Sequence, residues 1–294
     1  MEVPIVSVVI PTYKRIDTLP RAIDSVLNQT FGNLEVLIVD DNIPGSEFSR
    51  QVVKLIKDYS ERDSRVKYVG QKEHFNGAMA RNVGVYASRG EYIAFLDDDD
   101  EWLPDKLKKQ VDILDREKMV GGVSCLYTIF LAGKEIRRCA SYSDVNLQLN
   151  VLLRRVAIYT STFICRKNLF LEAGGFDINL GRHQDLQMFI DFMNYGKIKP
   201  INEHLVAIYA DSGQNRPDVE KLISVKKFFF ESISDSMQKY DDNWRRRIVN
   251  AHRFEIVVAA VRCNRYLLAL KYLLMVGFSI ESWIDVTMRY MKRC

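Results

Sequence analysis

Three observations predict an α/β fold for this chain of 294 residues, with a mainly parallel sheet flanked by helices and a helical C-terminal extension. Short, continuously apolar runs alternate with helical patterns through the first half, which is typical of a sheet covered on both faces. Hydrophobic residues make up 47% of the chain and charged residues 27%, which gives ample material for a core and excludes a disordered chain. Residues 218–294 have helical patterns throughout.

The expected elements follow in order along the chain. Apolar β-branched runs predict strands at residues 6–10, 35–39, 66–69 and 92–96. Between them, apolar residues at helical spacing predict helices at 19–27, 48–59 and 77–87, the last capped by Asn76. Beyond these lie a helix at 105–116, strands at 123–131 and 160–165, turns at 132–134 and 174–175, and a helix at 186–195.

Charge and cysteine usage narrow the class of protein. The net charge of +4 is too small to indicate nucleic-acid binding. The five cysteines are widely spaced with no C-x-x-C pair, so neither a zinc site nor a disulfide framework is expected. The N-terminus lacks the pattern of a signal peptide, and no run reaches the ~18 apolar residues of a spanning helix. We therefore expect a cytoplasmic protein, at most peripheral on the inner face of the cell membrane.

Polar or acidic side chains follow three of the expected strands. They lie at residues 11–15, at Asp40 and Asp41, and at residues 97–100. In open α/β sheets, ligands bind beyond the carboxyl ends of the strands. The three segments are therefore expected to meet in one site.

Four adjacent carboxylates, Asp97 to Asp100, form the most distinctive of these segments. They repel one another, so a folded chain needs exposure, a cation or a helix N-terminus near them. One interpretation is an acidic cap on the helix after Pro104. We favour a metal site, because the cluster directly follows an apolar strand and aspartate oxygens suit Mg²⁺ or Mn²⁺. Such a site leaves room for substrate phosphates, which implies a phosphorylated substrate.

The helix expected at 77–87 carries small residues and one cation, Arg81. Small residues allow a helix to approach the sheet closely, and a guanidinium suits a nucleotide or its phosphates. The plainer interpretation is a surface helix in which Arg81 pairs with a carboxylate. The residues alone leave both interpretations open.

Several motifs together resemble those of the family 2 glycosyltransferases, from about residue 4 to residue 209. They are VSVVIPTY at 6–13, SVLNQT at 25–30, VDD at 39–41, ARNVG at 80–84, GEYIAFLDDDDEW at 90–102, and GGFD at 174–177 followed by QD at 184–185. The resemblance implies an inverting, metal-dependent enzyme of the GT-A fold, whose sheet is Rossmann-related. It also implies a catalytic domain over 1–215, with a nucleotide-sugar half at about 1–103 and an acceptor half at about 104–215. Residues 216–294 would then form the helical extension.

The resemblance also implies roles for single residues. The nucleotide-sugar residues would be Pro11, Thr12, Tyr13, Asp41, Arg81, Asp97 and Asp98, with Asp98 facing the ribose. Asp97 and Asp99 would supply a D-x-D metal motif, and Asp99 is the preferred direct ligand for Mg²⁺ or Mn²⁺.

On the acceptor side, the resemblance makes Asp185 the general base, since a carboxylate must take the proton of the acceptor hydroxyl. The plainer role for Asp185 is an N-cap of the helix at 186–195. His183 lies beside it and is a candidate acceptor contact. Trp102 is another candidate there, although packing beside the acidic segment is its favoured role.

The chain departs from the family pattern at two places. Gln184 stands where the family often has Glu, a variant that retains the following aspartate. The segment YADSG at 209–213 lacks the basic or histidine-containing motif that is frequent there, so diphosphate contacts from this segment are in doubt.

The basic C-terminal segment leaves two interpretations open. Residues 245–294 carry a net charge of +7, whereas residues 1–244 carry −3. The basic residues are a solvated face of packed helices, or they attract an anionic membrane surface, at about 1 kcal/mol per basic residue.

The function expected from the sequence is sugar transfer from a nucleotide-diphosphate sugar to a saccharide or lipid-linked saccharide, in bacterial surface polysaccharide biosynthesis. One rival is a nucleotidyltransferase, which needs a glycine-rich loop after the first strand that residues 11–15 lack. The other rival is a catalytically silent scaffold subunit, which the retained Asp99 and Asp185 disfavour.

Overall fold

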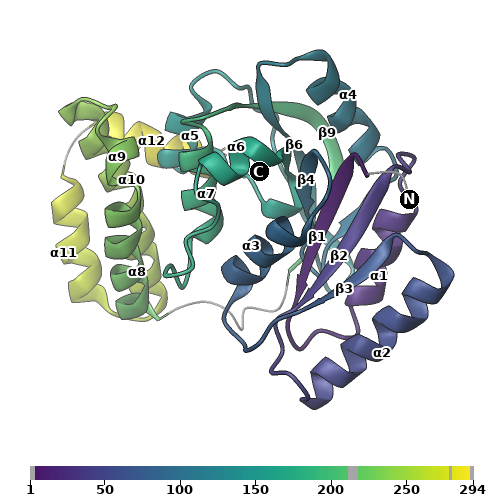
Figure 1. The fold of residues 1–294 in the computed structure, drawn as a ribbon. Helices are drawn as coiled ribbons and strands as arrows, with labels where there is room; N and C mark the ends of the chain where they lie inside the picture. The colour runs from purple at the N-terminus through teal and green to yellow at the C-terminus, as the bar shows by residue number, and fades with distance from the viewer. Residues whose placement is uncertain (1–3, 211–217, 278–279, 292–294) are drawn as a thin grey trace.

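Nine strands form one mixed sheet within residues 4–210, 218–277 and 280–291, which the computed structural model describes (Figure 1). The strand order is β3-β2-β1-β4-β8-β6-β9-β5, and β7 pairs with β6. The strands are β1 (Val6–Thr12), β2 (Leu34–Asp40), β3 (Val66–Gly70), β4 (Tyr92–Phe95), β5 (Glu101–Trp102), β6 (Val120–Leu131), β7 (Lys134–Arg138), β8 (Ile164–Arg166) and β9 (Lys197–Tyr209).

The first four strands are parallel, as the alternating pattern predicts. Val8 of β1 pairs with Val36 of β2 and with Ala94 of β4, and β3 continues the ladder beyond β2. The carboxyl ends of β1, β2 and β4 therefore open at one edge of the sheet. Antiparallel pairs enter with β5, β7 and β8, while β6 and β9 are again parallel.

Helices cover both faces of this sheet (Figure 1). One face packs against α1 (Leu19–Leu27), α2 (Glu47–Arg62) and α4 (Lys106–Arg116) in one apolar cluster. The other face packs in a second cluster against α3 (Gly77–Ala87), α5 (Leu147–Leu152), α6 (Lys167–Glu172) and α7 (Gln184–Phe192). Apolar strands between two helical layers explain the continuous hydrophobic runs of the sequence.

Close approach of α3 to the sheet depends on its small residues. A Cβ added at Gly84 would lie 2.3 Å from a Val9 side-chain carbon, which is too close for any larger residue. Asn76 caps this helix by accepting a hydrogen bond from the Met79 amide at 3.0 Å. Both expectations for this helix, the cap at Asn76 and the close approach to the sheet, are confirmed.

The C-terminal helices are α8 (Val219–Ser232), α9 (Ser234–Met237), α10 (Asp242–Arg262), α11 (Tyr266–Val276) and α12 (Ile280–Met291). Phe229 of α8 and Ile248 of α10 join the apolar cluster around α7, whereas α11 packs on α8 and α10 in a cluster of its own. Among the described residues, no single helix has the length and apolar character needed to cross a membrane. Within the same residues, α11 and Ile280–Met288 reach that length and apolar character only when taken together, and the two helices are bent by 119° relative to each other.

Some expected elements differ in the structure. The strand expected at 160–165 is a 3-10 turn, Thr160–Thr162, followed by β8. The hydroxyl of Thr162 donates to the Tyr159 carbonyl at 2.7 Å, a local bond that competes with strand pairing. The helix expected at 186–195 begins at Gln184 and ends at Phe192. The sequence also did not predict β9, because Pro200 and the polar residues 202–204 interrupt its alternation.

Candidate functional site

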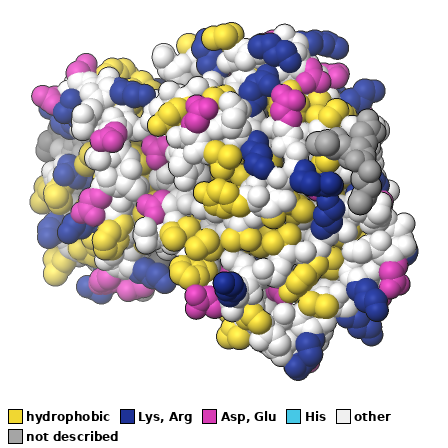
Figure 2. Space-filling model, in the orientation of Figure 1, with side chains coloured by type: hydrophobic (Ala, Val, Ile, Leu, Met, Phe, Trp, Pro, Cys, Tyr) yellow, Lys and Arg dark blue, Asp and Glu magenta, His cyan; other side chains and the backbone are white. Residues whose placement is uncertain are grey.

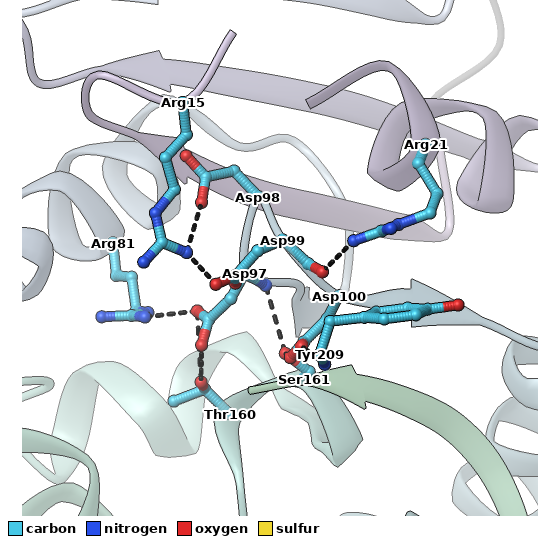
Figure 3. A network of polar contacts seen from close by, with 10 residues as sticks. All are labelled: Arg15, Arg21, Arg81, Asp97, Asp98, Asp99, Asp100, Thr160, Ser161 and Tyr209. Carbon is cyan, nitrogen blue, oxygen red and sulfur yellow. Dashed lines mark hydrogen bonds and ion pairs between the residues drawn. The ribbon is translucent and has the colours of Figure 1, made fainter. Parts of the chain in front are cut away.

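The acidic segment 97–100 lies at the carboxyl ends of β1 and β4, and side chains from other parts of the chain contact all four of its carboxylates (Figure 3). The Arg15 guanidinium lies 3.7 Å from an Asp98 carboxylate oxygen and also contacts Asp99. Asp97 pairs with Arg81 of α3, and Asp99 pairs with Arg15, which follows β1. Side-chain exposure is 32% for Asp97 and 22% for Asp99, so both carboxylates reach solvent. Mutual repulsion in the cluster is therefore balanced by arginines from two other elements.

The other two carboxylates are buried. Burial raises the pKa of Asp98 to about 6, against the opposing effects of the Thr12 hydroxyl and Arg15. Burial and the charge of Asp97 also raise the pKa of Asp100. Asp100 accepts hydrogen bonds from the Ser161 hydroxyl at 2.5 Å and the Tyr209 amide at 3.3 Å. Asp100 thus ties the acidic segment to the 160–162 turn and to the end of β9.

None of these carboxylates caps a helix. The helix after Pro104 begins at Lys106, and its N-cap residue is Asp105. The acidic-cap interpretation is therefore wrong, because the four aspartates lie at the sheet edge and pair with arginines and hydroxyls there.

Arg81 bridges the acidic segment and the loop that leads to α7. One guanidinium nitrogen binds Asp97, and another donates to the Gly77 carbonyl at 3.2 Å. The guanidinium carbon lies 5.5 Å from the centre of the Phe176 ring. The plain interpretation of Arg81, a cation paired with a carboxylate, is confirmed for this structure, and the carboxylate belongs to the expected site.

A second cluster lies where β1 and β2 end. The ring of Tyr13, which is 37% exposed, stacks on His74 with 4.1 Å between ring centres. Asp41 lies almost fully buried beneath this pair. Its carboxylate accepts from the Gln71 amide group at 2.7 Å and from the Phe75 backbone amide at 3.0 Å, and His74 Nδ1 lies 3.1 Å away. Asp41 therefore organises the 71–75 loop and, through it, the aromatic pair.

Pro11 and Thr12 complete β1 beside these clusters. Thr12 pairs with Asp40 across the ladder and is almost fully buried next to Asp98. Their position at the strand end agrees with the expectation that the first strand leads into the site.

Asp185 lies in the first turn of α7 and lines a hollow of about 300 Å³. Its carboxylate accepts from the Leu186 amide at 2.8 Å. The N-cap residue is His183, whose φ is 66°, so the expected capping role of Asp185 is wrong by two positions.

Tyr159 and Thr160 connect the acidic segment to the hollow beside Asp185. Tyr159 lines the hollow, while the hydroxyl of Thr160 lies 3.3 Å from an Asp97 carboxylate oxygen. On the other side, Asn76 at the start of α3 donates to the Ile178 carbonyl at 2.9 Å. Residues 159 and 160 therefore link the hollow to the acidic segment, and the Asn76 bond joins α3 to the loop before α7.

His183 and Trp102, the two candidate acceptor contacts, differ in whether they reach the hollow. His183 lines the hollow, but burial chiefly lowers its pKa to about 2, so it is uncharged, and its Nε2 is buried without a hydrogen-bond partner. Trp102 is only 2% exposed, and its indole N–H donates to the Ser161 carbonyl at 2.7 Å. Trp102 is thus a packing residue in this structure and offers no ring face to an acceptor.

The donor set near Asp97 and Asp99 fits a hard divalent cation. Two solvent-accessible carboxylates match the few protein ligands that Mg²⁺ or Mn²⁺ takes when phosphates complete its shell. Among the described residues, no group of three or more His, Cys, Asp or Glu side chains is arranged to hold a metal alone. A cation held here therefore needs oxygens from a substrate.

The structure adds residues that the sequence did not single out as site residues: Arg21, His74, Ser161 and Tyr209, together with Arg15. Arg21 donates to the Asp99 carbonyl at 2.5 Å and lies 3.7 Å from the Tyr209 ring centre. The sequence did indicate the region of Arg15, since this residue lies in the polar segment after the first strand. Tyr209 begins the YADSG segment, which the sequence marked only as atypical, and no motif indicated Arg21, His74 or Ser161 as site residues. Residues 211–213 of the atypical YADSG segment lie outside the described residues.

Comparison with known proteins identifies the family. The family model described as "Glycosyl transferase family 2" matches residues 7–176 of the chain. An uncharacterised glycosyltransferase of Rickettsia bellii is 31% identical over 200 residues, which are 68% of this chain and 28% of that protein. The amylovoran biosynthesis glycosyltransferase AmsB of Erwinia amylovora is 34% identical over 143 residues, 48% of this chain and 41% of AmsB. The chain thus spans less than half the length of these relatives.

Solved structures with the same fold share little sequence. S. aureus TarS 1-349, in complex with UDP-GlcNAc, aligns with a TM-score of 0.68 and 16% identity over 97% of this chain and 79% of TarS. The mannosyltransferase PcManGT of Pyrobaculum calidifontis, in complex with GDP-Man and Mn²⁺, aligns with a TM-score of 0.59 and 17% identity over 98% and 85%. The expected GT-A fold with C-terminal helices is thereby confirmed.

Proposed function

Because the chain belongs to glycosyl transferase family 2, we propose that it moves a sugar from a nucleotide-diphosphate sugar to an acceptor hydroxyl, with inversion. The observation that carries this proposal is the link, through Tyr159 and Thr160, between an arginine-bearing acidic site and a carboxylate in a separate hollow. Group transfer between two substrates needs these two sites side by side. The name of AmsB supports a place in bacterial surface polysaccharide biosynthesis.

The donor nucleotide is proposed to bind at the ends of β1 and β2. Tyr13, stacked on His74, offers an aromatic face to the base, and Asp41 holds the loop that carries His74. Pro11 and Thr12 form the floor, and Asp98 faces the ribose. Arg81 is proposed to contact the diphosphate, where its guanidinium matches phosphate oxygens.

Mg²⁺ or Mn²⁺ is proposed to bind Asp99 and Asp97. The cation would supply charge neutralisation for the leaving diphosphate without proton transfer. Arg15 and Arg81 hold the same two carboxylates in this structure, and they keep the pair in place when no cation is bound. Mn²⁺ in the PcManGT complex supports this proposal by analogy of fold only.

Asp185 is proposed as the general base. The acceptor oxygen bonds to the anomeric carbon, the bond from that carbon to the diphosphate breaks, and the acceptor proton passes to Asp185. Attack from the side opposite the leaving group inverts the configuration. The place of Asp185 in the lining of the hollow of about 300 Å³, where an acceptor hydroxyl would lie, supports this role.

A peripheral position on an anionic membrane surface is proposed for α11 and α12. The face of α11 directed away from the core carries Leu267, Leu270, Lys271 and Leu274, and Leu267 is 86% exposed. Figure 2 shows hydrophobic side chains interspersed with Lys and Arg at the edge where α11 lies. Apolar side chains with flanking cations are typical of interfacial helices.

Packing accounts for part of the basic C-terminal charge. Arg247 binds the buried Asp285 at 2.9 Å, and Arg265 pairs with Glu220 at 2.7 Å. Lys292 and Arg293 lie outside the described residues. The four described cysteines are free thiols, which supports the proposed cytoplasmic location.

A thermal-shift screen of nucleoside diphosphates and nucleotide sugars, with and without Mn²⁺, tests the proposed function. A ligand that binds only the folded protein raises its stability by about 2.7 kcal/mol at a hundred times its Kd. We expect one nucleotide to raise the melting temperature, and to do so more strongly with Mn²⁺. A screen in which no nucleotide shifts the melting temperature would contradict the proposal.

A further inference from the structure

Arginines gather in two adjoining hollows beside Asp185. The larger hollow, of about 300 Å³, is lined by Arg154 and Arg182 as well as Asp185. The smaller, of about 60 Å³, is lined by Arg137, Arg138, Arg154 and Arg155 together with Tyr127, Cys139, Ala157 and Tyr159. Arg154, Ala157 and Tyr159 line both hollows, so the two adjoin at these residues.

The smaller hollow has no acidic residue in its lining. Arg138 pairs with Glu135 on the surface, Arg154 with Glu255, and Arg155 with Asp285, and all three acids lie outside the lining. Arg137 has no carboxylate partner among the described residues. Carboxylates outside the hollow therefore balance three of the four guanidinium groups, and Arg137 is the one whose charge an anion in the hollow would neutralise.

A buried donor in this cluster is also unsatisfied. Nε of Arg155 is buried and has no hydrogen-bond partner in the described structure. An unmade hydrogen bond of a buried charged group is costly, which favours a ligand that supplies an acceptor.

The C-terminal helices hold Arg154 in position. Arg154 Nε binds Glu255 of α10 at 3.1 Å, and Glu255 also pairs with Lys226 of α8. Lys226 Nζ lies 2.8 Å from His252 Nδ1, and His252 Nε2 lies 3.0 Å from the Leu152 carbonyl. This buried network fixes the guanidinium before any ligand arrives, which reduces the entropic cost of binding.

We propose that the acceptor carries a phosphate or a carboxylate that binds Arg137, Arg154 and Arg155, while its reacting hydroxyl lies in the larger hollow at Asp185. This inference rests on the proposed function and names the chemical class of the acceptor. Guanidinium groups bind both kinds of anion in a bidentate manner. The donor diphosphate is assigned to Arg81 in the acidic site, so the arginine hollow is left for the second substrate.

The test is a calorimetric titration of the whole chain with three probes: a sugar 1-phosphate, a methyl glucuronide and a neutral methyl glucoside. Each titration is run with and without Mn²⁺ and the nucleoside diphosphate selected by the thermal-shift screen, which fills the donor site. The variant is Arg137→Gln, on the β6–β7 hairpin. The matched control is Arg116→Gln, a surface arginine of α4 whose side chain is 80% exposed.

We expect at least one anionic probe to bind with the donor site filled, and the neutral glucoside to bind roughly tenfold more weakly or worse. Arg137→Gln should weaken the anionic probe about tenfold, and Arg116→Gln should leave it unchanged. A preference between the phosphate and the glucuronide identifies the anion.

Equal affinity for neutral and anionic probes, no binding of any probe, or equal effects of the two variants would overturn the inference. If no nucleotide binds, the proposed function fails, and the titration without nucleotide still decides whether the hollow binds an anion.

Discussion

At the scale of single residues, two arginines balance the negative charge of the acidic segment. Arg15 and Arg81 come from two different elements and neutralise Asp99 and Asp97, while Asp98 and Asp100 are buried against hydroxyl groups. The two accessible carboxylates are the ones expected to bind a cation. The two buried carboxylates, Asp98 and Asp100, hold the segment in the conformation that leaves Asp97 and Asp99 accessible.

Asp99→Asn tests the metal site. Asparagine keeps the shape of the side chain and removes the charge that a divalent cation needs. We expect nucleoside diphosphate affinity in Mn²⁺, measured by calorimetry, to fall at least about tenfold. The melting temperature should hardly change, because a partly exposed ion pair contributes only about 0–1 kcal/mol.

Asp112→Asn is the control for that experiment, since Asp112 lies on the surface of α4 with a side chain 52% exposed. It should change neither affinity nor melting temperature. Unchanged nucleotide affinity in Asp99→Asn would remove Asp99 from the metal site.

The sequence could predict those residues of the site that lie in local motifs. Asp97, Asp99, Arg81 and Asp41 follow strands or lie on a helix with a small-residue face, and the parallel sheet brings them together. Arg21 and Ser161 reach the site from helix and turn positions without a local pattern. Only tertiary packing reveals such residues.

At the scale of elements, one buried carboxylate ties the N-terminal strands together. Glu35 of β2 is 2% exposed and accepts hydrogen bonds from Ser7 of β1 at 2.7 Å, Lys67 of β3 at 2.5 Å and the Arg89 amide at 2.7 Å. Burial raises its pKa, but the bonds from Lys67, Ser7 and Arg89 together outweigh burial and hold the pKa below its ordinary value of 4.5. Glu35 therefore stabilises the fold through its ionised form.

Glu35→Gln should lower the free energy of unfolding by about 2 kcal/mol near neutral pH. A carboxyl whose pKa is lowered by folding contributes stability above its unfolded pKa and loses it as the pH falls through the folded value. The difference between wild type and variant should therefore shrink below pH 4.5. Urea unfolding at neutral and acidic pH measures this difference.

Glu61→Gln is the matched control, because the Glu61 side chain is 65% exposed on α2. This substitution should hardly change the free energy of unfolding at any pH. A Glu35→Gln effect that does not vary with pH would show that shape, and not charge, accounts for the loss.

Helix α11 is the element proposed to contact the membrane surface. We expect the protein to co-sediment with vesicles that contain anionic lipid, and to dissociate as salt rises, because the Debye length is about 8 Å at physiological ionic strength. Replacing Leu267 and Leu274 together by Glu should abolish sedimentation. Met119→Glu, at a site that is 83% exposed on the loop before β6, should not.

Equal sedimentation with neutral and anionic vesicles, or none with either, would leave α11 and α12 as packing elements only. The sequence predicted that this region is helical but could not separate the two roles. Arg247 and Arg265 carry the same charge as Lys271, yet only the structure shows that they pair with acids.

At the scale of the whole molecule, the C-terminal helices are joined to the part of the molecule proposed to bind the acceptor. Lys226, His252 and Glu255 form a buried network that ends on Arg154, beside Asp185. Phe229 of α8 packs against His183, with 5.7 Å between ring centres. We therefore expect changes in α8 or α10 to affect acceptor use more than donor binding.

The two linked sites are proposed to perform one sugar transfer with Asp185 as the base. The most direct test is a paired measurement on Asp185→Asn: donor affinity by calorimetry, and nucleoside diphosphate release with an acceptor identified from the anionic probes. Asparagine has nearly the same shape but cannot take a proton. The proposed role of Asp185 as the base predicts unchanged donor affinity and a rate lower by a factor on the order of 10²–10⁴. A rate near that of the wild type would contradict it and leave Asp185 with a structural role only.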